Sequence, residues 1–273
     1  MRRLVRRPAF MAGLLILMVV VGAALLADVI APGDPLHTTR DGLLTPRRGH
    51  ILGTDNLGRD TFTGVVHGAR TSMTVVGWVA SVSTVIGLTV GLAAGYRGGR
   101  TDDLLMRVTE LFQSVPRFFL ALFWLGIAGP SLTNLIVVLA FTSWTLLARI
   151  VRAETKSAQA REFVDAARAM GASAPGIVVR HIFPAVLPVA MVIIAMTASR
   201  VILLESSLAF LGLTDQSRIS WGTMVSNAQP LLGSYWLLSL IPGTAIALTI
   251  VGINLVADSL AGSGERTYTE PVA

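Results

Sequence analysis

Six long apolar stretches dominate this sequence, and they limit the folds open to it more than any other feature. A helix needs about 20 apolar residues to cross the roughly 30 Å of hydrocarbon in a bilayer. Charged residues make up only 14% of the chain, whereas soluble domains carry roughly 25%. The sequence therefore predicts an all-α membrane protein with about six transmembrane helices. The apolar stretches are residues 10–27, 71–96, 104–127, 132–147, 184–204 and 236–256.

The first apolar stretch follows four arginines, an arrangement that secretory signal peptides share. A signal peptide has an apolar region of about 7–15 residues and then a cleavage site of small residues. The stretch 10–27 is longer than that, and it is followed by Asp28-Val29-Ile30. A transmembrane helix explains these features better than a cleaved leader does.

Glycine and proline mark two of the other stretches. Gly87, Gly91 and Gly95 recur every four residues in the second one, and such spacing lets the backbone of another helix approach closely. We therefore expect these glycines to serve helix packing.

Pro116 and Arg117 lie within the third stretch. A proline inside a helix removes a backbone hydrogen bond, so the third span should kink or break there.

The distribution of basic residues predicts the orientation. Cytoplasmic segments of membrane proteins carry more lysine and arginine than external segments do. With the N-terminus inside, the inner segments hold 14 basic residues and the outer segments hold 6, and two further arginines lie within spans. Both termini are therefore expected to be cytoplasmic. Most of the outer arginines fall in residues 32–70, a long loop, and long loops obey this rule less well.

Several functional classes lack the residues that they require. The chain has no cysteine, its four histidines are scattered, and its only lysine, Lys156, lacks the glycines of a phosphate-binding loop. The net charge of +6 is spread among the loops between apolar stretches, which argues against nucleic-acid binding. We expect no enzyme activity, no metal and no bound cofactor in this chain, so any ATPase that drives it would be a separate protein.

The segment between the fourth and fifth apolar stretches carries the strongest functional signal. Alanine-rich residues 162–170 predict a short helix, Gly171 predicts its C-terminal cap, and Pro175 predicts the start of a second short helix. Periodicity alone does not separate a helix lying on the membrane surface from one that docks into a partner. The alanines favour a protein cleft, because lipid insertion favours larger side chains. One apolar stripe is expected at Phe163, Ala166, Ala167 and Met170.

This segment resembles the EAA loop of ABC importer permeases. Asp165-Ala166-Ala167, then Gly171, then Ile182-Phe183-Pro184 follow its pattern, with Asp165 in place of glutamate and Phe183 in place of leucine. Other segments resemble the dipeptide/oligopeptide/nickel branch and its second, C-type, subunit. One of them, residues 50–60, has Ile51 where that family usually has proline. The remaining segments are residues 95–103, 205–213 and 220–222.

The resemblance implies a type I ABC importer permease fold, with cytoplasmic coupling helices between spans four and five. It implies a cytoplasmic (inner) membrane location and import of di- or oligopeptides by alternating access. The implied partners are a homologous permease, two cytoplasmic ATPases that bind ATP and Mg²⁺, an extracytoplasmic substrate-binding protein and membrane lipid. Larger side chains at the two alanines should clash with the ATPase. The residues implied in ATPase coupling are Glu162, Asp165, Ala166, Ala167, Met170 and Gly171.

Two ionisable residues near the end of the fifth span leave two interpretations open. Glu205 and Arg200 could face the transport pathway, because ionisable groups at membrane depth are usually functional. Alternatively, both could lie at the membrane interface, where long side chains reach water easily. A secondary transporter is the main rival function. It would place ion-coupling carboxylates within the spans, whereas the charges here cluster at span ends.

The predicted organisation has four parts. Residues 1–31 form an N-terminal tail and the first span, and residues 32–70 form an extracytoplasmic loop. Residues 71–258 form a five-helix permease core that contains the coupling loop 149–183. Residues 259–273 are expected to be a disordered cytoplasmic tail.

Overall fold

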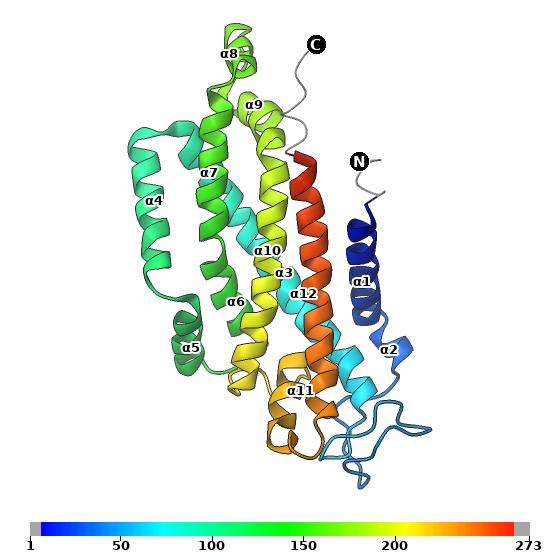
Figure 1. Ribbon diagram of the computed structural model, residues 1–273. Coiled ribbons are helices and arrows are strands. Elements are labelled where there is room, and N and C mark those ends of the chain that lie inside the picture. The colour runs from blue at the N-terminus through cyan, green and yellow to red at the C-terminus, as the bar shows by residue number, and fades with distance from the viewer. Residues whose placement is uncertain (1–6, 265–273) are drawn as a thin grey trace.

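Long helices run side by side through the protein, and a loop region covers one end of them (Figure 1). The computed structural model describes residues 7–264. In chain order the elements are α1 (Pro8–Leu25), α2 (Ala27–Ile30), α3 (Thr61–Arg97), α4 (Gly99–Ser114), α5 (Arg117–Ala128), α6 (Leu132–Ser143), α7 (Thr145–Gln159), α8 (Glu162–Ala169), α9 (Ala174–Ile177), η1 (Val178–Ile182), α10 (Phe183–Phe210), α11 (Trp221–Ala228), η2 (Gln229–Leu231) and α12 (Leu237–Gly264). The expected all-α architecture is confirmed for the described residues.

The number of candidate membrane spans also agrees with the sequence. α4 and α5 make a sixth span if the pair is counted as one, and they are bent by 76°. The bend falls at Pro116, the residue that caps the start of α5, so the predicted break is present. The other five segments that are long and apolar enough to cross a bilayer are Pro8–Leu25, Thr61–Arg97, Leu132–Gln159, Ala174–Phe210 and Leu237–Ala261.

The second span is longer than the sequence predicted. α3 begins at Thr61, because the Asp60 carboxylate accepts a hydrogen bond of 2.8 Å from the Thr63 backbone N–H and so caps the helix. The loop expected over residues 32–70 therefore ends at residue 60. Burial tends to raise the pKa of Asp60, but hydrogen bonds from Thr63 and His50 outweigh it and hold that pKa below its usual value.

Two further boundaries differ from the prediction. The second short helix expected at Pro175 is not separate, because α9, the π-helical η1 and α10 form one continuous helical segment, Ala174–Phe210. α12 continues to Gly264, so the tail predicted from residue 259 begins as helix. The remainder of that tail, like the first three arginines of the N-terminus, lies outside the described residues.

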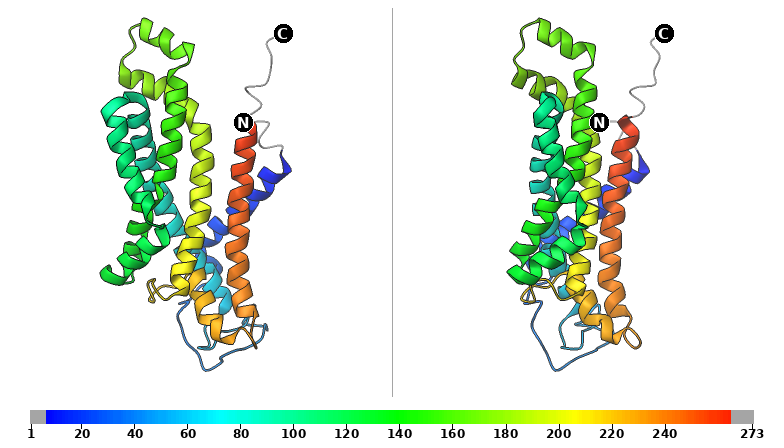
Figure 2. Two further views of the ribbon diagram at one scale, coloured as in Figure 1. Left: turned by 60° about the vertical axis from the view of Figure 1, so that its left-hand side comes forward. Right: turned by 90° about the vertical axis from the view of Figure 1, so that its left-hand side faces the viewer.

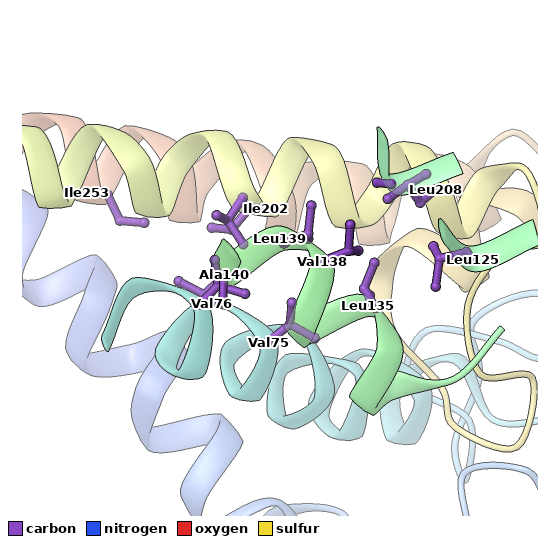
Figure 3. Packing of buried hydrophobic residues seen from close by; sticks show 13 residues of the cluster. Val75, Val76, Leu125, Leu135, Val138, Leu139, Ala140, Ile202, Leu208 and Ile253 are labelled. Carbon is purple, nitrogen blue, oxygen red and sulfur yellow. The ribbon is translucent and has the colours of Figure 1, made fainter. Parts of the chain in front are cut away.

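The main apolar core joins buried side chains of five helices, α3, α5, α6, α10 and α12. Figure 3 shows Val75 of α3, Leu139 of α6 and Ile202 of α10 meeting at its centre, and all three are fully buried. Lipid tails are as apolar as these side chains, so the hydrophobic effect gives little drive to bring such helices together. Close packing must therefore hold the helices together. Small residues at the helix contacts make this packing possible, because they let the backbones approach each other.

α3 and α7 make the most extensive contact in the bundle, and the glycine series of α3 lies along it. A Cβ atom on Gly87 would lie 2.9 Å from the side chain of Leu147, and one on Gly95 would lie 2.6 Å from the Cβ of Thr155. A Cβ on Gly91 would lie 2.7 Å from the carbonyl oxygen of Ala148. These glycines thus allow α7 to pack on α3 at backbone distance.

Replacing Gly91 with alanine should therefore destabilise the protein. We expect the free energy of unfolding to fall by about 1–3 kcal/mol, because the new methyl group forces the helices apart. Gly77→Ala is the matched control, since Gly77 lies in the same helix and its added Cβ would meet nothing within 4 Å. Thermal unfolding of the purified chain in detergent measures both variants, and equal shifts would contradict the packing role of Gly91.

Candidate coupling site

α8 projects beyond the ends of the long helices, at the opposite end of the bundle from the 31–60 loop (Figure 1). The two further views in Figure 2 show the same projection. α7 leads into α8 through residues 160–161, and α9 follows it after residues 170–173. The helix is therefore held at both ends by elements of the bundle while its outer surface remains uncovered.

Local interactions define where α8 begins and ends. Glu162 and Asp165 lie in its first turn and Arg168 in its last, as the helix dipole favours. Gly171 has φ +79°, a left-handed conformation in which glycine has no steric penalty. The Gly171 N–H donates to the carbonyl of Arg168, and the Ala172 N–H donates to the carbonyl of Ala167, each at 3.0 Å. The predicted glycine cap is confirmed by this geometry.

The structure divides the predicted apolar stripe between two faces of α8. Val164 and Ala167 are buried against the chain's own second core cluster, and Ala167 is only 2% exposed. Ala166 and Met170 face outward, with Met170 81% exposed, and Phe163 is 40% exposed beside the ring of His181. The sequence placed both alanines on the docking face, and this is wrong for Ala167, because the helix packs on the bundle through that side.

The outward face of α8 combines small, apolar and acidic groups. It carries Phe163, Ala166 and Met170, with the exposed carboxylates of Glu162 and Asp165 beside them. Asp165 also forms an ion pair of 3.2 Å with Arg168 in the same helix. Exposed methionine and phenylalanine side chains on one face of a short helix are typical of a surface that a partner covers.

An ion cluster around one buried carboxylate ties α7, which leads into α8, to α4. Asp102 of α4 is buried, and both of its carboxylate oxygens accept hydrogen bonds from the Arg152 guanidinium of α7. Lys156, one turn further along α7, donates to the same carboxylate at 2.6 Å. Sequence reasoning missed this cluster. Its only signal is the spacing of Arg152 and Lys156 by four residues, which places them on one helix face.

Glu205 lies inside the subunit rather than at its surface. It is 2% exposed, and its carboxylate accepts long hydrogen bonds from Ser72 of α3 at 3.4 Å and from Ser206 at 3.5 Å. Burial keeps the Glu205 carboxylate away from the surface of the subunit, and none of the described hollows is lined by it. Arg200 is exposed. The structure therefore does not bring Glu205 and Arg200 together as one site.

Over residues 7–264, no group of three or more histidine, aspartate or glutamate side chains converges as a metal site. The ion pairs of the described residues include the Asp102 cluster described above.

The chain has the fold of a type I ABC importer permease. A solved structure of a methionine ABC transporter in an inward-facing conformation matches it with a TM-score of 0.56 and 20% identity. The match covers 75% of this chain and 94% of that chain. A second crystal form of the same transporter matches with a TM-score of 0.57.

Residues 87–268 match the family described as "Binding-protein-dependent transport system inner membrane component", and the chain belongs to this family. Residues 1–46 match the "N-terminal TM domain of oligopeptide transport permease C". The protein is therefore a multi-pass permease of the peptide and nickel branch, as the resemblance of its loops predicted.

Similar proteins carry the names of several cargoes. A putative peptide transport system permease of Brucella suis is 39% identical over 95% of this chain and 88% of its own length. A dipeptide transport system permease of Bacillus subtilis is 34% identical over 95% and 82%. A nickel transport system permease of Escherichia coli is 35% identical over 80% and 79%.

Asp102→Asn should weaken the attachment of α4 to α7. We expect the free energy of unfolding to fall by roughly 1–3 kcal/mol, because two cations lose their shared carboxylate. Asp103→Asn is the matched control, since Asp103 is exposed and neighbours Asp102 on the same helix. Unfolding of the purified chain in detergent measures both, and a loss no larger for Asp102 than for Asp103 would show that the cluster is not a structural tie.

Proposed function

We propose that this chain is the transmembrane permease subunit of an ATP-driven importer that moves di- or oligopeptides across the cytoplasmic membrane by alternating access. The observation that carries the proposal is the projecting α8, whose inner face packs on the bundle while Phe163, Ala166 and Met170 remain uncovered. In this proposal, separate cytoplasmic ATPases cover that face. They would bind ATP and Mg²⁺ and hydrolyse the ATP, and this chain would bind neither.

The proposed mechanism transmits movement through rigid contacts. When ATP closes the ATPase pair, α8 moves with the ATPase as a rigid body. α7 moves with α8, and the Asp102 cluster carries the movement into α4, the first half of the broken span. Modest forces suffice if the inward-facing and outward-facing states differ by a few kcal/mol.

The orientation belongs to the same proposal. The end of α12 and the whole of α8 lie at one end of the bundle, and the 31–60 loop lies at the other (Figure 1). If α8 meets a cytoplasmic ATPase, the termini are cytoplasmic and the loop is extracytoplasmic. The excess of basic residues on the α8 side supports this assignment.

Peptides are the proposed cargo because two of the similar permeases above carry peptide or dipeptide names. Nickel is the second candidate, since another similar permease carries that name. A metal path would be expected to present clustered ligands, and none converge in the described part of the chain. An extracytoplasmic binding protein and a homologous permease are proposed to complete the assembly within the lipid.

Affinity purification of the chain from its native membrane, followed by mass spectrometry, tests the assembly. We expect a second permease, ATPases and a binding protein to be recovered together. The purified complex in vesicles should then take up labelled dipeptide only when ATP is supplied. Recovery of the chain alone as a homo-oligomer, with uptake that is insensitive to ATP, would instead support a secondary transporter.

The two alanines of α8 provide a matched pair of variants. Ala166→Leu alters the uncovered face, so the chain should fold normally while peptide-stimulated ATP hydrolysis by the complex falls at least about tenfold. Ala167→Leu overfills the buried face, so it should lower the free energy of unfolding by about 1–3 kcal/mol. ATPase assays and unfolding measurements on both variants separate these effects. Full ATPase coupling in Ala166→Leu would contradict the docking role of this face.

A further inference from the structure

A polar hollow lies between α4 and α7, on the α8 side of the bend at Pro116 (Figure 1). Its volume is about 490 Å³. Binding sites for whole small molecules occupy about 300–1,000 Å³, so the hollow has the size of such a site. The residues that line it are Asp103, Met106, Arg107, Glu110, Arg149 and Arg152.

The charged side chains that α4 contributes to this hollow do not neutralise one another. Asp103 and Arg107 are four residues apart, and Arg107 and Glu110 are three apart, so all three lie on one helix face where ion pairs commonly form. No ion pair among residues 7–264 includes any of the three. The α4 wall of the hollow therefore presents charges of both signs that remain open to a ligand.

The two arginines of α7 differ in how much of their charge is available. The guanidinium of Arg152 is engaged by the buried Asp102 carboxylate. Arg149 is exposed, and it donates a hydrogen bond of 2.9 Å to the uncharged side chain of Gln113. Arg149 of α7 and Arg107 of α4 thus bring positive charge to the hollow from both of its walls.

The position of these charges makes the hollow unsuitable for lipid tails. α4 is the first half of the bent span, and Glu110 lies 11 residues after its start at Gly99, or about 17 Å along the helix. Ionisable side chains within spans face a water-filled cavity or a protein partner rather than hydrocarbon. The hollow is therefore expected to hold water or a polar ligand.

We propose that this hollow binds the cargo as a zwitterionic dipeptide, with the terminal carboxylate on Arg107 and Arg149 and the terminal ammonium on Glu110. The two ends of an extended dipeptide lie about 7 Å apart, and side chains three residues apart on a helix are about 5–6 Å apart at Cβ. Guanidinium groups bind carboxylates with strong, charge-assisted hydrogen bonds. The inference rests on the proposed function, which supplies the cargo class, although alternating access itself requires no fixed cargo site in the permease.

A ligand with charges of both signs fits this lining better than a ligand with one. A simple anion would meet the carboxylates of Asp103 and Glu110, and a bare metal cation would meet the unpaired guanidinium groups of Arg107 and Arg149. Like charges at close range repel each other strongly where water is scarce. The hollow therefore favours a peptide over a bare nickel ion.

Photo-cross-linking locates the bound peptide. The probe is alanyl-leucine with a diazirine in its leucine side chain, added to the permease–ATPase complex in nanodiscs without nucleotide or binding protein. Mass spectrometry of the digested complex should find the label on α4 and α7. Unlabelled dialanine should compete at least about tenfold better than either acetyl-dialanine or dialanine amide, because each blocked form loses one charge-assisted hydrogen bond.

Two variants assign the two ends of the peptide. Arg107→Gln should shrink the preference for the free carboxylate and keep that for the free ammonium, and Glu110→Gln should do the reverse. A merely structural loss would not produce these opposite changes. Both side chains are exposed and lie outside the ion pairs of residues 7–264, so the variants should fold. Arg100→Gln is the matched control, an exposed arginine of α4 outside the hollow, and it should behave like the wild type.

Several results would overturn the inference. They are a label that falls outside α4 and α7, blocked dipeptides that compete as well as dialanine, and equal effects of Arg107→Gln and Arg100→Gln. Native mass spectrometry gives a further one. If no dipeptide labels the hollow, and phosphatidylethanolamine is retained by the wild type but lost from Arg107→Gln, the hollow belongs to a lipid headgroup instead.

Failure of the inference can be told apart from failure of the proposed function. ATP-dependent dipeptide uptake without labelling of α4 or α7 overturns the inference alone. A wild-type complex that shows no ATP-dependent uptake overturns the proposed function, and the inference with it.

Discussion

The contact between α3 and α7 is the interaction on which the rest of this structure depends. Apolar burial alone gives helices in lipid little reason to associate, so the bundle relies on backbone-distance packing at Gly87, Gly91 and Gly95. That contact fixes α7, and α7 in turn positions α8 beyond the bundle and presents Arg152 and Lys156 to Asp102. The features proposed for energy coupling are therefore built on three residues that have no side chain.

Sequence reasoning succeeded where the determining interactions are local. The number of spans follows from the length of the apolar stretches, and the caps at Asp60 and Gly171 follow from neighbouring backbone groups. It placed helix ends less well, because the amphipathic start of α3 and the continuous α9–η1–α10 segment depend on contacts with other elements. The buried face of α8 was also misplaced. A helix of eight residues carries too short a pattern to show whether Val164 or Phe163 turns inward.

The polar residues of the spans show the same contrast between local interactions, which the sequence reveals, and long-range ones, which it does not. Asp102 and its two cations lie 50 and 54 residues apart in the chain, so no short-range pattern joins them. The sequence left open whether Glu205 faces the pathway or lies at the membrane interface, and the structure adds that serines from α3 and from its own helix enclose it. Such enclosure is set by which helices are neighbours, and that information is absent from a hydropathy profile.

The continuous course of α9, η1 and α10 has a geometric consequence. α8 is followed by a helical segment of 37 residues, which at 1.5 Å per residue spans about 55 Å. A tilt of about 5° would move the far end of such a rod by about 5 Å. Because α7 is attached to the other end of α8, the short helix joins two long helical segments. In the proposed mechanism, a push on α8 would tilt these segments and move their far ends at the opposite side of the bilayer, with no need for any flexible part in between.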